Sequence, residues 1–258
     1  MNFELKDKVV LVTGGAKGIG AAICRAAAQE GALPVIVDRD EDAGRSLLAE
    51  LGAERARFVA ANLCGADRCR EAVQQAEAFF GRLDSVVNNA GINDGVGLER
   101  GTPQQFRESL ERNLLHYYDV AHFAFPALQR ARGTIVNIAS KVAFTGQGNT
   151  SGYAAAKGGV VALTREWAAE LLPFGIRVNA VIPAEVMTPL YEQWLGQFAE
   201  PQQKLELIIS RIPLGRRMTT IEEIAATVMF LISAQSSHTT GQLVFVDGGY
   251  VHLDRALT

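Results

Sequence analysis

The sequence predicts an α/β fold in which a doubly wound parallel sheet is covered by helices on both faces. Two observations lead to this prediction. Apolar segments rich in β-branched residues alternate with helical patterns along the whole chain. Those segments are almost continuously apolar, which is typical of parallel strands that are buried on both faces. Strict alternation of strand and helix then gives right-handed crossovers and a layered sheet.

Seven segments have the length and composition of buried strands. They are Lys8–Thr13, Leu33–Val37, Arg57–Ala61, Leu83–Val87, Gly133–Ile138, Ile176–Ile182 and Gln242–Val246. The segments between them are predicted as helices, and the first places Ile19, Ile23 and Ala27 on one face. The predicted helices are Gly18–Gly31, Glu41–Leu51, Ala66–Phe80, Pro103–Arg130, Tyr153–Leu172 and Ile221–Ile232.

The segment Thr188–Pro213 follows the sixth predicted strand and is polar, with apolar residues at irregular spacing. Ligands of open α/β sheets bind beyond the carboxyl ends of the strands. We therefore expect residues 188–213 to form a lid over a substrate. No linker, charge run or repeat divides the chain, so a single domain over residues 1–258 is the simplest organisation.

The composition is that of an ordinary globular protein, with 48% hydrophobic and 21% charged residues. The formal net charge of -3 argues against a sequence-independent nucleic-acid binder, which needs a basic face. The acidic N-terminal segment does not fit a signal peptide, and no apolar stretch reaches the roughly 18 residues of a membrane span. We expect a cytoplasmic protein without a nucleic-acid or membrane partner.

The cysteines and histidines show no metal-binding pattern. Cys24, Cys64 and Cys69 form no CxxC pair and have no histidine at ligand spacing. We interpret them as free thiols of a reducing cytoplasm. The 4 histidines also lack ligand spacing, so no metal site is expected and the histidines are given no role.

A glycine-rich turn, Thr13-Gly14-Gly15-Ala16-Lys17-Gly18-Ile19-Gly20, follows the first predicted strand directly. Gly14 lets the chain turn off the strand, Gly18 lets a pyrophosphate approach the backbone, and Gly20 lets the helix pack closely. The helix N-terminus presents free N–H groups and a positive dipole end to phosphates. The place of this turn between strand and helix predicts a dinucleotide site, although the spacing is Gly-x-x-x-Gly-x-Gly.

Asp38 closes the second predicted strand and points to NAD as the cofactor. A carboxylate at this place can accept hydrogen bonds from the adenosine ribose and repels the 2′-phosphate of NADP. Lys17 and Arg39 lie close in sequence to the same site, and either can attract a phosphate. NAD is therefore the predicted cofactor, and NADP remains the alternative.

Tyr153 and Lys157 are spaced i, i+4 in the helix after the fifth predicted strand, so they share one helix face. A free tyrosine has a pKa near 10, which is too high for a base at neutral pH. A neighbouring ammonium stabilises the phenolate and lowers that pKa. Ser140, at the end of the fifth strand, can donate a hydrogen bond to the reacting oxygen.

Taken in order, these motifs resemble the short-chain dehydrogenase/reductase family over essentially the whole chain. The matching pieces are Thr13-Gly14-x-x-x-Gly18-Ile19-Gly20, Asn88-Asn89-Ala90-Gly91, Asn113, Ser140, Tyr153-x-x-x-Lys157 and Arg177-Val178-Asn179. The resemblance implies a seven-stranded Rossmann sheet, a nicotinamide cofactor, a small-molecule substrate and assembly into a homodimer or homotetramer.

The resemblance also implies roles for individual residues. Tyr153 would act as the general acid/base, while Lys157 would lower its pKa and hold the nicotinamide ribose. Ser140 would position the substrate oxygen, and Asn113 would support a proton-relay water. The cofactor-binding residues predicted from the motifs and the resemblance are Gly14, Lys17, Gly18, Ile19, Gly20, Asp38, Arg39, Asn62, Leu63, Asn89, Ala90, Gly91, Ile138, Tyr153, Lys157, Pro183, Val186 and Thr188.

Two departures from the family pattern affect the predicted site. Asn62-Leu63 stands where the family usually has an aspartate beside the adenine, and an asparagine amide can still hydrogen-bond adenine. Pro183-Ala184-Glu185-Val186-Met187-Thr188 stands where Pro-Gly is frequent. We expect the backbone at Val186 to contact the nicotinamide carboxamide and Thr188 to lie near the phosphate. Glu185 adds an acid close to the reaction centre.

The segment Ser140–Gly152 is polar where steroid- or acyl-binding relatives tend to be apolar. Thr150 and the other polar residues of this region can hydrogen-bond several hydroxyls, and two aromatic residues of the lid can stack on a sugar ring. The predicted substrate-binding residues are Ser140, Gln147, Asn149, Tyr153, Glu185, Tyr191 and Trp194. Together with Pro183–Tyr191 they resemble the aldose dehydrogenases of the L-fucose type, which oxidise an anomeric C1 hydroxyl to a lactone.

Two other functions are considered. One is a reductase of 3-oxoacyl thioesters or another secondary-alcohol dehydrogenase, and the reductase would favour NADP and a basic docking patch. Arg211, Arg216 and Arg217 can supply that charge, but Asp38 argues against the cofactor. A non-catalytic nucleotide sensor is disfavoured because all four catalytic positions are intact.

Overall fold

The computed structural model describes residues 3–253 and contains the predicted sheet of seven parallel strands. The strands are β1 (Val9–Thr13), β2 (Leu33–Asp38), β3 (Arg57–Ala60), β4 (Ser85–Asn88), β5 (Thr134–Ile138), β6 (Arg177–Pro183) and β7 (Leu243–Val246). Their order across the sheet is β3-β2-β1-β4-β5-β6-β7. The predicted doubly wound α/β fold is therefore confirmed. Residues 1–2 and 254–258 of the predicted domain range lie outside the described residues.

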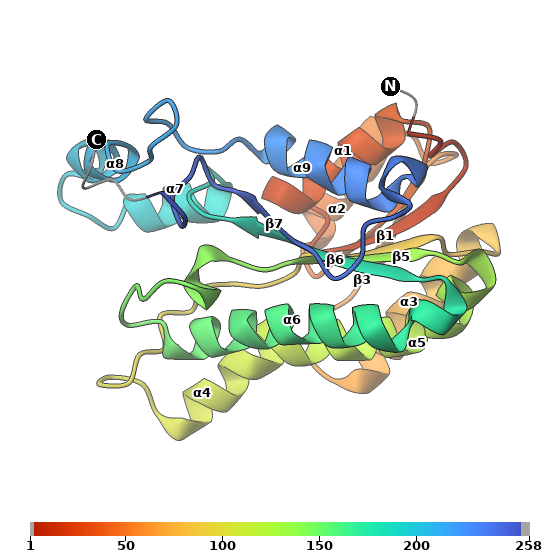
Figure 1. Cartoon of the computed structure of the whole chain (residues 1–258), viewed down its shortest axis with the longest axis horizontal. Helices are drawn as coiled ribbons and strands as arrows, with labels where there is room; N and C mark the ends of the chain where they lie inside the picture. The colour runs from red at the N-terminus through yellow and green to blue at the C-terminus, as the bar shows by residue number, and fades with distance from the viewer. Residues whose placement is uncertain (1–2, 254–258) are drawn as a thin grey trace.

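Helices cover both faces of the sheet, as Figure 1 shows. One layer holds α1 (Gly18–Gln29), α2 (Glu41–Leu51) and α9 (Ile221–Ile232). The other layer holds α3 (Ala66–Phe80), α4 (Pro103–Leu110), α5 (His116–Ala131) and α6 (Ser151–Glu170). The remaining helices, α7 (Pro189–Leu195) and α8 (Pro201–Ile209), lie together at one end of the molecule.

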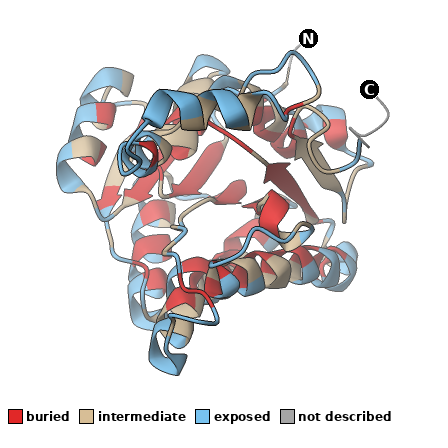
Figure 2. Ribbon diagram, turned by 90° about the vertical axis from the view of Figure 1, so that its left-hand side faces the viewer, coloured by how far each residue is buried: buried red, intermediate tan, exposed pale blue. Residues whose placement is uncertain are grey.

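Two apolar cores lie on the two faces of the sheet. On β1, Val9 and Leu11 belong to the core beneath α3, α5 and α6, whereas Val10 and Val12 belong to the core beneath α1 and α9. Successive side chains of a strand point to opposite faces, so a strand that is buried on both sides must be apolar throughout. Figure 2 shows the result, with buried strands between helices whose outer faces are exposed.

The long helix predicted over Pro103–Arg130 is interrupted by a π-helical turn, Glu111–Leu115, which separates α4 from α5. Such turns insert an extra residue into the helix and are frequent at functional sites. Apolar periodicity does not reveal one inserted residue, so the sequence predicts a continuous helix. Asn113 is the central residue of this turn and is buried.

The predicted lid segment, Thr188–Pro213, contains the two short helices α7 and α8 rather than irregular chain. The hydroxyl of Thr188 accepts a hydrogen bond from the Tyr191 backbone N–H and caps α7, and Pro189 begins the helix. Proline is favoured in the first turn because its missing N–H would have no partner there. Among residues 3–253, no helix has the length and apolarity needed to cross a membrane.

The motif Arg177-Val178-Asn179 holds the last strand in place. The guanidinium of Arg177 donates to the carbonyl of Leu231 at 2.9 Å and to the hydroxyl of Ser236 at 2.8 Å. The side-chain amide of Asn179 donates to the carbonyl of Thr239 at 2.9 Å. These bonds join β6 to the chain that leads from α9 into β7.

Candidate active site

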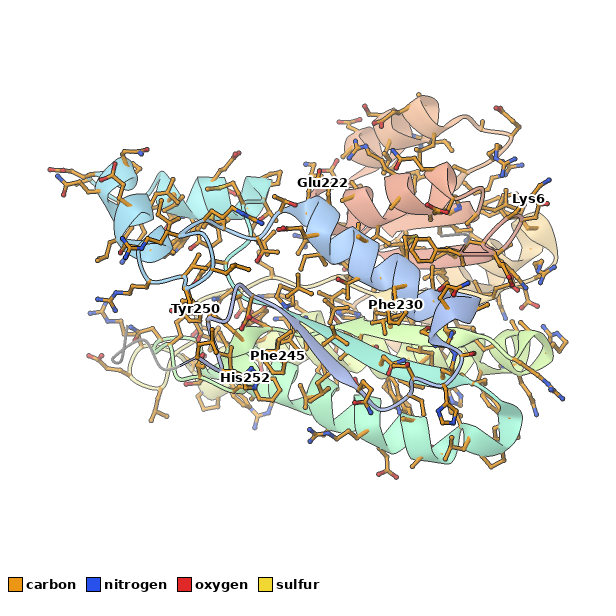
Figure 3. The ribbon with its side chains drawn as sticks, turned by 45° about the horizontal axis from the view of Figure 1, so that its top comes forward. Lys6, Glu222, Phe230, Phe245, Tyr250 and His252 are labelled. Carbon is orange, nitrogen blue, oxygen red and sulfur yellow. The ribbon has the colours of Figure 1, made fainter. Side chains whose placement is uncertain are left out.

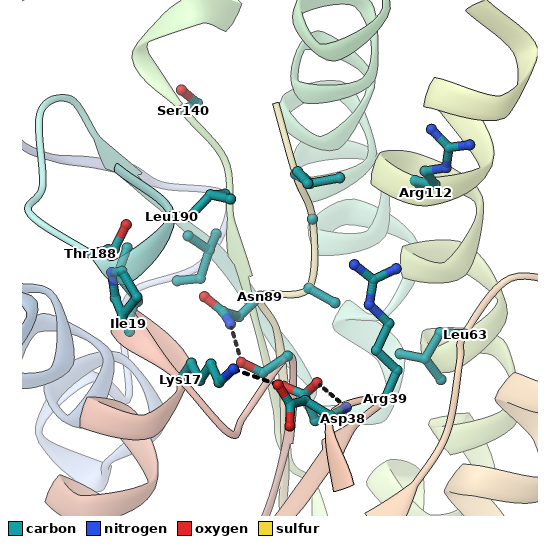
Figure 4. Close-up of a pocket in the computed structure, with 18 of the residues that line it drawn as sticks. Lys17, Ile19, Asp38, Arg39, Leu63, Asn89, Arg112, Ser140, Thr188 and Leu190 are labelled. Atoms are coloured by element: carbon teal, nitrogen blue, oxygen red, sulfur yellow. Dashed lines mark hydrogen bonds and ion pairs between the residues drawn. The ribbon is translucent and has the colours of Figure 1, made fainter. Parts of the chain in front are cut away.

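A cleft of about 550 Å³ opens at the carboxyl ends of β1 and β4, where the strand order reverses. This is the place at which open α/β sheets bind ligands. Figure 4 shows Asp38 and Arg39 at one end of the cleft and Ser140 at the other. The predicted site residues that line it are Gly14, Lys17, Gly18, Ile19, Asp38, Arg39, Asn62, Leu63, Asn89, Ala90, Gly91, Ile138, Ser140, Tyr153, Lys157, Pro183, Val186, Thr188 and Tyr191.

Six predicted site residues are not among the described residues that line this cleft, namely Gly20, Asn113, Gln147, Asn149, Glu185 and Trp194. Gly20 and Asn113 lie directly behind its wall. Gln147 and Asn149 are exposed on the loop before α6. Trp194 is exposed on α7, where its ring packs against Tyr191 and Phe198.

The glycine turn is bonded to the end of β4. The hydroxyl of Thr13 accepts hydrogen bonds from the N–H groups of Asn89 and Ala90, and the Asn89 amide donates to the carbonyls of Thr13 and Gly14. A Cβ at Gly20 would lie 2.1 Å from the Gly14 carbonyl oxygen, so only glycine allows α1 to start this close to the strand. The helix has no side-chain cap and no acidic residue in its first turn.

At the other end of the turn, Asp38 is held by the backbone. Its carboxylate accepts hydrogen bonds from the N–H groups of Ala16 and Asp40, both at 3.0 Å. Lys17 forms an ion pair with Asp40, and this hydrogen bond raises the pKa of the lysine and lowers that of Asp40. Arg39 is exposed and reaches into the cleft. The cleft therefore has at this end two carboxylates, the paired ammonium of Lys17 and the guanidinium of Arg39.

Ser140, Tyr153 and Lys157 meet at the opposite end of the cleft. Ser140 follows β5, and the other two lie one turn apart on α6. The ammonium of Lys157 is 2% exposed and lies 5.6 Å from the centroid of the Tyr153 ring. It donates hydrogen bonds to the carbonyl of Ile138 at 2.8 Å and to the hydroxyl of Tyr117 at 2.9 Å.

Burial dominates the titration of this pair. Burial raises the pKa of Tyr153 to about 12, the hydrogen bond with Ser140 acts in the opposite direction, and Asp94 adds to the rise. Burial also lowers the pKa of Lys157 to about 7. The sequence led us to expect a tyrosine pKa lowered by the ammonium. In the structure the loss of hydration is the larger effect, because Lys157 is buried and Tyr153 is half-buried in the wall of the cleft.

Asn113 supports the cleft wall through its side chain. Its Oδ1 accepts from the N–H of Ile92 at 2.7 Å, and its Nδ2 donates to the carbonyl of Ser109 at 2.9 Å. A Cβ at Gly91 would lie 3.0 Å from this Oδ1 and 3.6 Å from Nζ of Lys157. The glycine therefore lets the π-helical turn and Lys157 approach the same stretch of backbone.

Glu185 pairs with Lys141 behind the cleft, although the sequence led us to expect a substrate contact. The carboxylate forms an ion pair with Lys141 and accepts a hydrogen bond from the Tyr191 hydroxyl at 2.7 Å. Both charged side chains are about 10% exposed, and the ammonium of Lys141 lies 4.2 Å from the centroid of the Tyr250 ring. The carboxylate thus joins the residue after Ser140 to the first turn of α7.

Three residues that were not predicted from the sequence as site residues also belong to the site. Arg112 and His116 line the cleft, and Tyr117 bonds to Lys157 behind it. His116 is buried, its Nε2 lies 3.0 Å from the carbonyl of Arg112, and burial lowers its pKa to about 4. The spacing Asn113 to Tyr117 is i, i+4, which is the signal that could have indicated Tyr117.

The residues present fit a dinucleotide cofactor. The uncapped start of α1 and the glycine turn suit a pyrophosphate, and Asp38 suits a ribose. Thr188 and Val186 also line the cleft, and the Thr188 side chain lies opposite Gly18 of the glycine turn. No group of three or more metal-binding side chains occurs within residues 3–253.

Known proteins similar to this chain place it in a family. Residues 14–251 match the family model described as enoyl-(acyl carrier protein) reductase. L-fucose dehydrogenase from Oryctolagus cuniculus is 42% identical over 94% of this chain and 84% of its own length. The 3-oxoacyl-[acyl-carrier-protein] reductase of Thermotoga maritima is 37% identical over 96% of this chain and 99% of its own.

A solved structure, that of Cj0485 dehydrogenase, superposes with a TM-score of 0.95 at 45% sequence identity. The match covers 100% of this chain and 99% of that one. Sequence, fold and motif order therefore agree. This chain belongs to the short-chain dehydrogenase/reductase family, oxidoreductases that use nicotinamide cofactors.

Proposed function

We propose that this protein oxidises the anomeric C1 hydroxyl of an aldose resembling L-fucose to a lactone, with NAD as the hydride acceptor. One observation carries the proposal. Tyr153, Ser140 and Lys157 meet at one end of a cleft that has Asp38 at its other end, in a chain 42% identical to an L-fucose dehydrogenase. When bound, the nicotinamide ring would receive the hydride that leaves C1.

The protein's own groups handle the proton. Ser140 donates a hydrogen bond to the sugar oxygen and holds it beside Tyr153. The phenolate of Tyr153 accepts the hydroxyl proton, and the ammonium of Lys157 stabilises the phenolate before that transfer. Asn113 keeps the π-helical turn against the Ile92 backbone and so supports a water that relays the proton. Because burial raises the pKa of Tyr153, oxidation should accelerate as the pH rises above neutrality.

Cofactor choice is proposed to depend on Asp38. Its carboxylate lies at the rim of the cleft with two backbone N–H donors, and it retains lone pairs for the ribose hydroxyls. A 2′-phosphate placed there would be repelled by Asp38 and by the nearby Asp40. The adenine would lie between Asn62, Leu63 and Ala90.

The segment 188–213 is proposed to close over the sugar. Thr188, Leu190, Tyr191 and Gln193 reach the cleft from α7 and its first turn. Gln147, Asn149 and Trp194 lie outside the cleft walls in this structure. A contact with a sugar requires movement of this segment for Trp194 and of the loop before α6 for Gln147 and Asn149. Glu185 contributes by holding the Tyr191 hydroxyl.

The decisive experiment is a comparison of initial rates with NAD and a panel of L-fucose, D-arabinose, L-galactose, a hydroxysteroid and a 3-hydroxyacyl thioester. We expect one of the sugars to be turned over fastest, with NAD preferred to NADP. Faster turnover of the steroid or the thioester than of every sugar would contradict the proposal. Tyr153→Phe should abolish turnover and leave NADH binding, followed by fluorescence, nearly unchanged.

The second candidate is reduction of a 3-oxoacyl thioester. It is favoured by the identity of 37% to the Thermotoga maritima reductase and by the description of the matching family model. It would require NADPH and a basic face for an acyl carrier. The thioester in the panel, run with NADPH, tests this candidate directly.

A homo-oligomer is proposed as well. Every residue of β1, β4 and β5 is buried, but every residue of the edge strand β7 is only half-buried. Figure 3 shows Phe245 on this strand with Tyr250 and His252 beside it, and the rings of Phe245 and His252 are 4.3 Å apart. An apolar edge strand of this kind is suited to cover by a second copy of the chain.

A further inference from the structure

Tyr117 and the catalytic lysine share a closed set of hydrogen bonds. The Tyr117 hydroxyl donates to the Ile138 carbonyl at 2.9 Å and accepts from Nζ of Lys157 at 2.9 Å. Nζ of Lys157 donates to the same carbonyl at 2.8 Å. The three groups come from α5, α6 and the end of β5, and both side chains are almost fully buried.

The directions of these bonds follow from the chemistry. A carbonyl oxygen carries no proton, so Ile138 can only accept. Burial raises the pKa of Tyr117 well above its ordinary value, so its hydroxyl keeps its single proton and gives it to Ile138. A lone pair on the hydroxyl oxygen is then left for Lys157, which donates two of its three N–H groups here.

The ammonium also lies between two tyrosine rings. Its distance is 4.9 Å from the centroid of the Tyr117 ring and 5.6 Å from that of the Tyr153 ring. A buried ammonium is costly unless acceptors replace its lost hydration. Core packing alone would be served by an apolar residue at position 117, and it does not explain a hydroxyl aimed at the lysine.

We infer that Tyr117 is a positioning residue, whose hydroxyl favours the ammonium form of Lys157 against the effect of burial and directs that ammonium toward Tyr153. This inference rests on the proposed function, in which Lys157 assists Tyr153. Tyr117 touches neither the substrate nor the cofactor and acts through the lysine.

The consequence is that the pH dependence of sugar oxidation is set in part by Tyr117, which lies outside the Tyr153-x-x-x-Lys157 motif. The titratable groups that interact with Tyr117 and Lys157 are Tyr153 on α6 and His116 on α5, and Asp94, in the loop after β4, acts on Tyr153 in turn. Without the hydroxyl, the ammonium loses an acceptor and deprotonates at lower pH. The phenolate of Tyr153 is then less stabilised, so the active base appears only at higher pH.

The test compares Tyr117→Phe with its neighbour Tyr118→Phe. Each change removes one hydroxyl, but Tyr118 is 53% exposed and stacks on His122. Sugar oxidation is followed from pH 6 to pH 10. For Tyr117→Phe we expect the rising limb of kcat to move up by about one pH unit and kcat at pH 7 to fall about tenfold, as for the loss of one hydrogen bond to a charged group.

In the same variant the KM for the sugar and the affinity for NADH should stay within about twofold of wild type. Tyr118→Phe should match wild type in every measurement. A Tyr117→Phe enzyme with the wild-type pH profile, even if less stable to heat, would overturn the inference.

Two further variants keep the result interpretable. If Tyr117→Phe does not fold, Tyr117→Met fills the same apolar space without a hydroxyl and must show the same shift. Tyr153→Phe separates the two proposals. Retained turnover in that variant would overturn the proposed function, whereas its loss together with a normal Tyr117→Phe profile would overturn only the role of Tyr117.

Discussion

At the scale of single residues, the ammonium of Lys17 beside the proposed cofactor site is already paired with the carboxylate of Asp40, close to the end of β2. Lys17 stands in the glycine turn, where it could attract a phosphate, but its ammonium binds Asp40. Asp40 also caps α2 by accepting from the Ala43 N–H at 3.0 Å. The Asp40 carboxylate therefore caps α2 and also pairs with a cation that could otherwise bind a phosphate.

Asp40→Asn should raise kcat/KM with NADP about fivefold, because it frees the Lys17 ammonium from an exposed ion pair, and should change kcat/KM with NAD little. Asparagine retains the helix cap, so the fold is preserved. Steady-state kinetics with both cofactors measure the effect. Adding Lys17→Ala to this variant should remove the gain. A gain that persists without Lys17 would contradict the explanation.

At the scale of elements, the start of α7 is held to the strand ends by one buried ion pair. Lys141 follows Ser140, Glu185 follows β6, and the Tyr191 hydroxyl on α7 joins the same carboxylate. The backbone carbonyl of Glu185 also accepts from the Thr219 N–H at 3.0 Å, on the chain that enters α9. Three separate segments are thereby fixed beside Ser140.

Lys141→Met should lower the free energy of unfolding by about 3 kcal/mol, because it leaves the Glu185 carboxylate buried without its cation. Chemical denaturation monitored by circular dichroism measures this loss. Lys141→Met combined with Glu185→Gln should recover much of it, since glutamine still accepts from Tyr191. If the double variant is less stable than the single one, the ion pair is not the source of the effect.

At the scale of the whole molecule, stability in acid should depend on the interior near the π-helical turn. Burial lowers the pKa of His116 to about 4 from its ordinary value of 6.5. The unfolded chain therefore takes up this proton at higher pH than the folded one. The contribution is fully present above pH 6.5 and is lost as the pH falls toward 4.

His116→Gln should weaken this acid dependence by up to about 3 kcal/mol between the two pKa values. Glutamine is neutral throughout and can still donate to the Arg112 carbonyl. The measurement is the free energy of unfolding at pH 7 and at pH 4 for both proteins. If the free energy of unfolding falls by the same amount from pH 7 to pH 4 in both proteins, His116 does not titrate in this way.

The apolar edge strand β7 leads to a second prediction at this scale, which concerns the oligomeric state. Light scattering coupled to size-exclusion chromatography should give twice or four times the mass of one chain. A monomer at micromolar concentration would contradict the proposed assembly.

The sequence by itself determined the sheet, the glycine turn and the pairing of Tyr153 with Lys157. Each of these three features depends on residues that are close together in the sequence. Continuous apolar runs specify strands that are buried on both faces, glycines permit a turn after β1, and the i, i+4 spacing places two side chains on one helix face. Because parallel strands end at one edge of the sheet, residues that follow them also met in the cleft.

Only the tertiary structure decided which distant side chains pair. Glu185 bonds to Lys141 across 44 positions of the sequence, and Lys157 bonds to Tyr117 across 40. Such pairs depend on how helices and loops pack on the sheet, and on a π-helical turn that shifts α5 by a fraction of a turn. Composition and periodicity identify a buried face, but they do not specify which polar group on it meets which partner.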